Sequence, residues 1–199
     1  MRRTLVLFVR TPALGTGKRR LAREIGDVAA LRFERQMLAL LLRRLGGDRR
    51  WHMRVAATPD RRPPRLPHRR ARIERVAQGT GDLGARMRRA IALCPPGPVV
   101  LVGADIPDLS APHIAAAFRL LGARDPVFGP AEDGGFWLVG TRRRHQLAAL
   151  FGSVRWSTEN ALADSLANLP PAARVGFVAR LEDVDDAEAY RRLAPDRGF

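Results

Sequence analysis

The sequence is poor in lysine, cysteine and aromatic residues. It has 35 Lys and Arg residues against 20 Asp and Glu residues, which gives a formal net charge of +15 at pH 7. Only one of the basic residues, Lys18, is a lysine. The single cysteine, Cys94, excludes an internal disulfide. Aromatic residues make up 6% of the chain, which argues against a surface that stacks nucleic-acid bases. The charge predicts attraction to anions without choosing among them, and arginine spread along the chain also fits a genome of biased base composition.

Long apolar runs are also missing. The longest runs, such as residues 37–42, fall far below the roughly 18 residues of a membrane-spanning helix. The apolar stretch near the amino terminus is shorter than that of a signal peptide, which has roughly 7–15 apolar residues and a cleavage site. We therefore expect a soluble, cytoplasmic protein without a membrane span. With 199 residues, 46% of them hydrophobic, the chain is long enough for one domain, 1–199, with a sizeable core.

Short apolar runs alternate with longer helical patterns. Strands are predicted at 4–9, 53–58, 71–78, 98–105, 126–129, 135–140 and 174–179, and helices at 19–45 with a break at Gly26, at 82–93, 110–121, 143–150 and 157–168, and at the carboxyl terminus. This alternation predicts an α/β fold, a three-layer α/β/α sandwich around a mostly parallel mixed sheet. In such sheets ligands bind beyond the carboxyl ends of the strands.

The only lysine lies in a Gly-rich loop between the first strand and the first helix, in the segment TPALGTGK. Gly15 and Gly17 allow close backbone approach, and the start of a helix favours a phosphate. A Walker A motif is excluded because Pro12 stands at its first glycine position and Arg19 follows the lysine. The dinucleotide fingerprint fails because no third glycine follows. A solvated basic helix start is the alternative interpretation.

Acidic residues follow three later strands. Asp105 ends the strand at 98–105, where a carboxylate faces the ligand crevice or caps a turn. Glu132 and Asp133 stand beside a Gly-Gly pair, which also suits a hairpin turn. The segment EDVDD follows the last strand and also suits the acidic start of a helix. Together with the basic loop, these positions predict a metal–diphosphate site, because Mg²⁺ typically uses one or two carboxylates plus substrate phosphates.

Five segments, TPALGTGKRRLA, QGTGDLGARM, VVLVGADIPDL, GPAEDGGFWLVG and LEDVDD, resemble in order a bacterial family of GT-A-type glycosyltransferase-like proteins, often labelled arsenosugar-biosynthesis glycosyltransferases. This family lies in the nucleotide-diphospho-sugar transferase superfamily, together with the molybdenum-cofactor and phospholactate guanylyltransferases. The resemblance spans nearly the whole chain and implies a GT-A (Rossmann-like) fold. It also implies a metal-dependent glycosyltransferase with a nucleotide-diphosphate sugar donor, a small-molecule acceptor and a divalent cation, Mg²⁺ or Mn²⁺.

The resemblance further implies a role for each matching residue. The phosphates would be held by Gly15, Lys18 and Arg20, the nucleoside by Gln78, Gly81, Asp82 and Gly84, the metal by Asp105 and Asp185, and the acceptor by Gly134, Gly135 and Trp137, with Asp133 and Glu132 as catalytic or acceptor-orienting carboxylates. Three residues depart from the family pattern, and the first is Arg19, which stands at the usual threonine after the lysine. Asp186 stands at a usual threonine and Ala189 at a usual acidic residue, which bears on the second metal ligand.

Other functions remain open from the sequence. Nucleotidyl transfer, from a nucleoside triphosphate to a phosphorylated small molecule, needs the same loop and Asp105, and GPAEDGGFWLVG only weakly favours the glycosyltransferase branch. A family member that binds nucleotide without catalysis is a further alternative. The basic segment 61–75 predicts salt-dependent affinity for nucleic acid, but a solvated loop explains it better, and we expect no specific nucleic-acid partner. The oligomeric state is not predicted.

Overall fold

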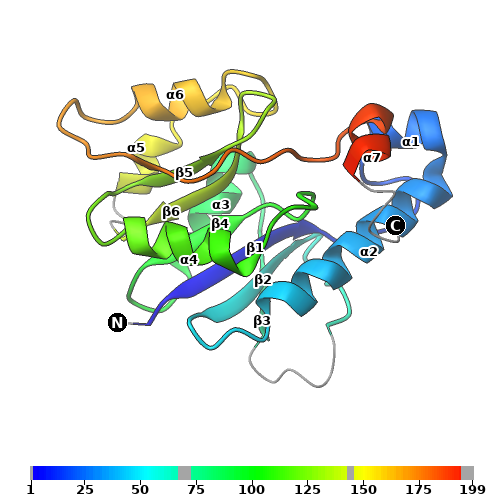
Figure 1. The fold of residues 1–199 in the computed structure, drawn as a ribbon, viewed down its shortest axis with the longest axis horizontal. Coiled ribbons are helices and arrows are strands. Elements are labelled where there is room, and N and C mark those ends of the chain that lie inside the picture. Colours follow the sequence, from blue (N-terminus) through cyan, green and yellow to red (C-terminus); the bar gives the residue numbers. More distant parts are fainter. Residues whose placement is uncertain (1, 67–72, 143–145, 194–199) are drawn as a thin grey trace.

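The computed structural model describes residues 2–66, 73–142 and 146–193, which form a seven-stranded sheet flanked by helices (Figure 1). The strands are β1 (Thr4–Arg10), β2 (His52–Thr58), β3 (Ile73–Ala77), β4 (Val99–Val102), β5 (Val127–Pro130), β6 (Phe136–Thr141) and β7 (Gly176–Phe177). Their order across the sheet is β3-β2-β1-β4-β6-β5-β7. All neighbouring pairs are parallel except those of β6 with β4 and β5. The predicted mixed, mostly parallel sheet is confirmed.

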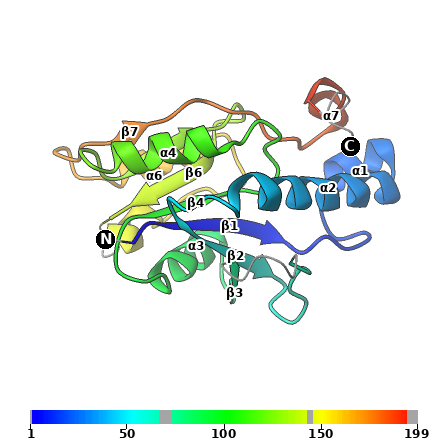
Figure 2. The same cartoon turned by 60° about the horizontal axis from the view of Figure 1, so that its bottom comes forward.

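Helices cover both faces of this sheet (Figure 2). They are α1 (Arg19–Ile25), α2 (Asp27–Leu45), α3 (Leu83–Ala92), α4 (Ala111–Leu120), α5 (Leu147–Leu150), α6 (Ala161–Ala167) and α7 (Ala187–Leu193). One core cluster lies under α2 and α4, and a second lies under α3 and α5 with α6 packed against it. The three-layer α/β/α architecture is therefore confirmed. Among the described residues, no helix combines the length and hydropathy of a membrane span.

Burial on both faces explains why the sequence of the central strand β1 is apolar throughout. Leu5 and Leu7 belong to the cluster under α2, whereas Val6 belongs to the cluster under α3, and all three side chains are fully buried. Side chains alternate between the two faces of a strand, so a strand covered on both faces needs a continuous apolar run. Such burial fixes the carboxyl end of β1, from which the Gly-rich loop leaves.

Three of the predicted boundaries that differ from the structure bear on the position of the cleft. β4 ends at Val102 rather than 105, so Asp105 lies beyond the strand. β7 covers only two residues of 174–179, but backbone amides of Val178 and Leu181 still bond to β5, which carries the chain toward the cleft. α6 begins at Ala161 rather than 157, because the residues before it form a turn. The predicted break at Gly26 is confirmed by its φ of 88°.

Some predictions lie outside the described residues. Residues 67–72 carry part of the basic segment 61–75 and the start of the predicted strand at 71–78, and residues 143–145 carry the start of the predicted helix at 143–150.

Candidate functional site

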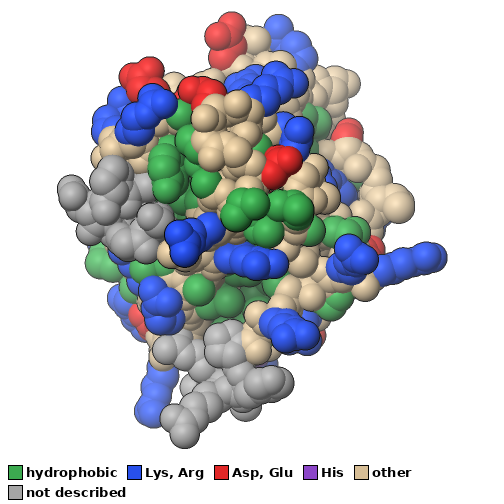
Figure 3. All heavy atoms as spheres, turned by 90° about the vertical axis from the view of Figure 1, so that its right-hand side faces the viewer, with side chains coloured by type: hydrophobic (Ala, Val, Ile, Leu, Met, Phe, Trp, Pro, Cys, Tyr) green, Lys and Arg blue, Asp and Glu red, His purple; other side chains and the backbone are tan. Residues whose placement is uncertain are grey.

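A cleft lies where β1 and β4 end and β6 begins. It consists of two adjoining cavities of ≈ 420 Å³ and ≈ 510 Å³, which share Lys18, Asp105, Asp185 and Trp137. Figure 3 faces the end of the molecule toward which β1 points, where Lys and Arg side chains surround exposed apolar side chains. The cavities therefore lie where ligands are expected in such sheets, beyond the carboxyl ends of the strands.

Lys18 lies at the junction of the two cavities. It precedes α1 with φ 42° and ψ 49°, a left-handed conformation that is uncommon outside glycine. Its Nζ is 2.6 Å from Oδ2 of Asp105 and 2.5 Å from Oδ1 of Asp185, and only 11% of its side chain is exposed. Burial disfavours the ammonium, but the charges and hydrogen bonds of both carboxylates outweigh it and raise the pKa of Lys18 above its ordinary value. Lys18 therefore stays protonated and carries its positive charge between two carboxylates.

A third carboxylate, Asp183, completes the cluster. Oxygens of Asp105, Asp183 and Asp185 all lie within 4.8 Å of one another. Burial, together with the charges of Asp105 and Asp185, raises the pKa of Asp183 to about 7. Val184, fully buried, donates its backbone N–H to the carbonyl oxygen of Asp105 at 3.0 Å and so brings the segment to the end of β4.

The sequence interpretation missed Asp183, although a signal for it was present. In an extended segment the side chains of residues two apart point the same way, so a buried Val184 turns its two acidic neighbours to the opposite side. Carboxylate oxygens are hard ligands that suit Mg²⁺ or Mn²⁺. Asp105, Asp183 and Asp185 are therefore the described residues that could hold a divalent cation, with Lys18 beside them.

Two of the three departures from the family pattern, Asp186 and Ala189, fall at a helix start instead of in the cluster. The carboxylate of Asp186 accepts a hydrogen bond from the backbone N–H of Ala189 at 2.9 Å, directly before α7. Aspartate and threonine are both good residues for capping the start of a helix. Ala189 itself is buried, 6% exposed. Neither substitution removes a carboxylate from the cluster.

The Asp-Gly-Gly turn between β5 and β6 contributes to the second cavity, which Asp133, Gly135 and Trp137 line. The indole N–H of Trp137 donates to the carbonyl oxygen of Ala179, so this side chain is already anchored. Gly134 has a φ of 83°, and a Cβ there would overlap the backbone of the segment before α6.

Glu132 lies outside both cavity walls, is exposed, and forms an ion pair with Arg180 at 3.7 Å.

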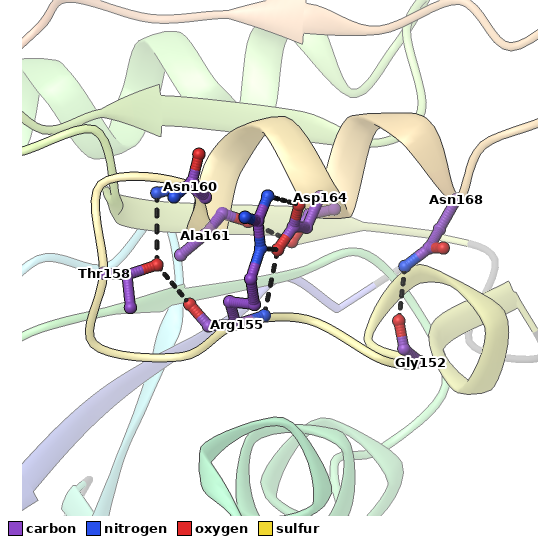
Figure 4. Close-up of polar contacts among 8 residues, drawn as sticks. Gly152, Arg155, Thr158, Asn160, Ala161, Asp164 and Asn168 are labelled. Atoms are coloured by element: carbon purple, nitrogen blue, oxygen red, sulfur yellow. Dashed lines mark hydrogen bonds and ion pairs between the residues drawn. The ribbon is translucent and has the colours of Figure 1, made fainter.

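The segment before α6 forms another wall of the second cavity, which the sequence interpretation missed. Trp156, Ser157 and Thr158 line it. The segment is held by Arg155, whose guanidinium and backbone N–H donate to the carboxylate of Asp164 at 2.7–3.0 Å (Figure 4). Ser157 has a φ of 61°, a strained backbone conformation for a residue with a side chain.

The residues predicted to hold the nucleoside lie at the base of α3. Gln78 is fully buried, and its side-chain amide donates to the carbonyl oxygens of β1 and β2 at 3.0 and 2.8 Å. Asp82 accepts the backbone N–H of Ala85 at 2.7 Å and caps α3. Gly81 has a φ of 103°, and a Cβ at Gly84 would lie 2.7 Å from the Trp156 ring. None of these four predicted residues lines either cavity, but their neighbour Leu83 lines both.

The remaining predicted phosphate ligands lie on either side of Lys18. Arg20 is exposed and lines the second cavity. Gly15 is exposed, has a φ of 73°, and lies outside both cavity walls. The structure therefore brings together the lysine, the acidic positions after the strands and the aromatic strand, and leaves Gly15 and the 78–84 loop at the periphery.

Solved structures that share this fold include proteins described as nucleotide-dependent transferases. A candidate nucleotide-diphospho-sugar transferase from Desulfovibrio desulfuricans G20 aligns over 100% of this chain and 90% of its own, with 25% identity and a TM-score of 0.84. The 4-diphosphocytidyl-2C-methyl-D-erythritol synthase of Anaerococcus prevotii DSM 20548 aligns over 96% and 94%, with 10% identity and a TM-score of 0.61. Rv0371c of Mycobacterium tuberculosis H37Rv, in complex with manganese, aligns over 97% and 98%, with 18% identity and a TM-score of 0.56.

These similarities confirm the resemblance to the nucleotide-diphospho-sugar transferase superfamily and the α/β fold that it implies. No curated protein matches the sequence significantly. Residues 41–158, more than half of the chain, match the family described as uncharacterized proteins conserved in bacteria (DUF2064). The chain therefore belongs to the DUF2064 family and has the fold of the nucleotide-diphospho-sugar transferases.

Proposed function

We propose that the protein is a metal-dependent glycosyltransferase that takes its sugar from a nucleotide-diphosphate donor. The observation that carries this proposal is the cluster of Asp105, Asp183 and Asp185 around Lys18, at the junction of two cavities. One cavity is available for the nucleotide and the other for the acceptor. The reacting sugar, which links donor and acceptor, then lies at the junction beside the charged cluster.

The residues divide the chemistry among them. A divalent cation held by the three carboxylates would neutralise the diphosphate leaving group. Lys18 moves from its carboxylate partners to the phosphate oxygens, as a flexible point charge can do. The bond between the sugar carbon and the diphosphate oxygen breaks, and the acceptor oxygen bonds to that carbon. In an inverting reaction Asp133 takes the proton of the acceptor hydroxyl. Gly135 and Trp137 bound the acceptor, and Arg20 supports the diphosphate.

Two similarities support this assignment. The relative from Desulfovibrio desulfuricans, described as a candidate nucleotide-diphospho-sugar transferase, is 25% identical over the whole of this chain. The Mycobacterium tuberculosis protein of the same fold was solved with manganese. Neither similarity identifies the base, the sugar or the acceptor.

Nucleotidyl transfer is the second candidate, and the cytidyl-transferring neighbour supports it. That reaction needs a phosphorylated acceptor, whose charge calls for cations in the acceptor cavity. The second cavity instead presents four carboxylates, from Asp105, Asp133, Asp183 and Asp185, against three cations. Two of those cations, Lys18 and Arg19, already form ion pairs with carboxylates. With three of these carboxylates assigned to the cation, Asp133 is the carboxylate left among the described lining residues, and it suits a neutral acceptor hydroxyl that loses a proton, and hence glycosyl transfer.

Thermal shift measurements with UDP, GDP, their sugar conjugates and the matching triphosphates, each with and without Mn²⁺, test the proposal. A ligand at about 100 times its dissociation constant adds about 2.7 kcal/mol, or roughly 5–10 °C in a domain of this size. We expect the largest metal-dependent shift with one nucleotide sugar, followed by release of its nucleoside diphosphate. A preference for a triphosphate, with release of pyrophosphate, would establish nucleotidyl transfer instead. No shift with any nucleotide would overturn both assignments.

A further inference from the structure

Glu34 on α2 faces the first cavity but has no role in the site described above. Its carboxylate lines that cavity together with Lys18 and Asp105. Across residues 2–66, 73–142 and 146–193, this carboxylate forms neither a hydrogen bond nor an ion pair. A half-buried carboxylate without a partner has lost water without gaining a hydrogen bond in return, so this arrangement costs free energy. A ligand that supplies hydrogen-bond donors would recover that cost.

The Gly-rich loop leaves room for this carboxylate. A Cβ at Gly17 would overlap the carboxylate of Glu34, including both of its oxygens. Gly17 is not among the glycines with a positive φ, so its backbone conformation alone does not require glycine. The close approach of Glu34 is therefore the feature of the structure that accounts for glycine at position 17.

The surroundings of Glu34 act on its pKa in opposite directions, with a net increase. Burial raises the pKa of Glu34 above its ordinary value, the positive charges of Lys18 and Arg10 lower it, and the charge of Asp105 raises it further. A carboxylate repels phosphate oxygens, so a nucleotide in this cavity must turn a different part toward Glu34. Hydroxyl and N–H groups of the nucleoside are the donors available to it.

We propose that Glu34 recognises the nucleoside of the donor by accepting hydrogen bonds from ribose hydroxyls or from N–H groups of the base. This inference rests on the proposed function, which places the diphosphate at Lys18 and the three carboxylates. The first cavity extends from that point between α2 and α3, over the apolar side chains of Phe8, Leu83 and Met87. These apolar side chains suit a nucleoside, and Glu34 is an acceptor in the same cavity wall to which no group of the described residues donates a hydrogen bond.

Isothermal titration calorimetry of three proteins tests the inference: the wild type, Glu34→Gln, and the control Glu24→Gln, which removes a charge from the exposed side of α1. Each is titrated, in Mn²⁺, with ADP, CDP, GDP, UDP and inorganic pyrophosphate. Glu34→Gln keeps the side-chain shape but loses the charge. We expect it to weaken the preferred nucleoside diphosphate about tenfold, as for a hydrogen bond to a charged group, and to leave pyrophosphate unchanged. Glu24→Gln should change neither.

The 2′,3′-dideoxy form of the preferred nucleotide separates the two sources of donors. If the effect of Glu34→Gln disappears with the dideoxy form, Glu34 accepts hydrogen bonds from the ribose hydroxyls. If the effect persists, Glu34 accepts them from N–H groups of the base. An equal loss for pyrophosphate, or no loss for the nucleotide, would overturn the inference and leave the proposed function standing. Binding of neither nucleotide nor pyrophosphate by the wild-type protein would overturn the proposed function, and the inference with it.

Gly17→Ala gives an independent test, because the added methyl group must push the Glu34 carboxylate aside. The displaced atoms are the end of a flexible side chain, so we expect little loss of stability. Gly17→Ala should weaken nucleotide binding as Glu34→Gln does, and should add no further loss in a Glu34→Ala background. Full additivity of the two losses would show that Gly17 acts on the phosphates by itself and would contradict the link to Glu34.

Discussion

Two Gly-rich loops leave the carboxyl ends of parallel strands, β1 and β3, which lie on either side of β2, and the structure uses them differently. The loop after β1 ends in Lys18, whose ammonium reaches the junction of the two cavities. In the loop after β3, Gln78 bonds to backbone carbonyls and Asp82 caps α3. The resemblance assigns the first loop to the phosphates and the second to the nucleoside, but among the described residues of the two loops only those of the first place a charged side chain in the cleft.

The difference between the loops follows from where their polar groups find partners. Asp82 is satisfied within its own helix start, and Gln78 within the sheet, so neither side chain gains much from a ligand. Lys18 has only other ionisable groups as partners, and these can be exchanged for phosphate oxygens. We therefore expect substitutions in the first loop to change binding and substitutions in the second to change stability.

Asp105→Asn should produce the largest effect. It removes one charge from the three-carboxylate cluster and keeps the shape of the side chain. We expect metal-dependent binding of a nucleoside diphosphate to weaken by about a hundredfold, or about 2.7 kcal/mol. Calorimetry with Mn²⁺ and the preferred nucleotide measures this change, and circular dichroism verifies the fold. A loss below about threefold would remove Asp105 from the metal site.

Lys18→Met should separate metal binding from nucleotide binding. The ammonium competes with a cation for Asp105 and Asp185, so its removal should tighten binding of Mn²⁺ alone by about tenfold. The same substitution removes a phosphate ligand and should weaken binding of the nucleoside diphosphate by at least about tenfold. Electron paramagnetic resonance of free Mn²⁺ follows the first change and calorimetry the second. Weaker binding of Mn²⁺ as well as of the nucleoside diphosphate would contradict the proposed competition between the Lys18 ammonium and the cation.

Asp82→Ala is the matched substitution in the second loop. Loss of the helix cap should lower the free energy of unfolding by about 1 kcal/mol, which is roughly 2–4 °C in Tm. Nucleotide binding should stay within about twofold of the wild-type value because Asp82 lies outside both cavities. Differential scanning calorimetry measures the change in Tm, and titration calorimetry measures the affinity for the nucleotide. A large loss of affinity with unchanged stability would reverse the assignment of the two loops.

Asp164→Asn tests the segment before α6, which forms a wall of the second cavity, and should have the smallest effect. The hydrogen bonds and charge of Arg155 lower the pKa of Asp164 to about 2. A lowered pKa stabilises the folded protein above the unfolded pKa, near 4, and that contribution is lost as the pH falls toward 2. We expect a slightly lower Tm for the variant at pH 7, with the difference from wild type shrinking below about pH 4. A difference that does not depend on pH would exclude the ion pair as its cause.

The sequence predicted what depends on local pattern and on strand ends. The fold class, the lysine loop and Asp105 follow from apolar periodicity and from the rule that ligands bind beyond parallel strands. The choice of Asp185 within the acidic segment EDVDD came from the resemblance. Gln78 and Asp82 were assigned to the nucleoside from the resemblance, and that role stays a prediction, although both side chains already bond within the chain.

The rest depends on contacts between distant segments. Asp183 joins the cluster because β7 and the residues after it follow β5 and deliver the acidic segment beside β4. Glu34 approaches Gly17 only because α2 folds back over the loop. Trp156 and Thr158 reach the cleft through a turn that Arg155 and Asp164 fix. No spacing in the sequence shows these approaches, although the spacing of Asp183 and Asp185 around Val184 does place the two carboxylates on one side of their segment.

The central claim is that the three carboxylates hold a divalent cation together with a nucleoside diphosphate. Its most direct test is the titration of Mn²⁺, followed by electron paramagnetic resonance, with and without the preferred nucleotide. We predict one site per chain in the wild-type protein, tightened by the nucleotide because the diphosphate adds ligands and draws Lys18 away. The site should be lost in Asp183→Asn as well as in Asp105→Asn. Wild-type binding retained in both variants would contradict the account.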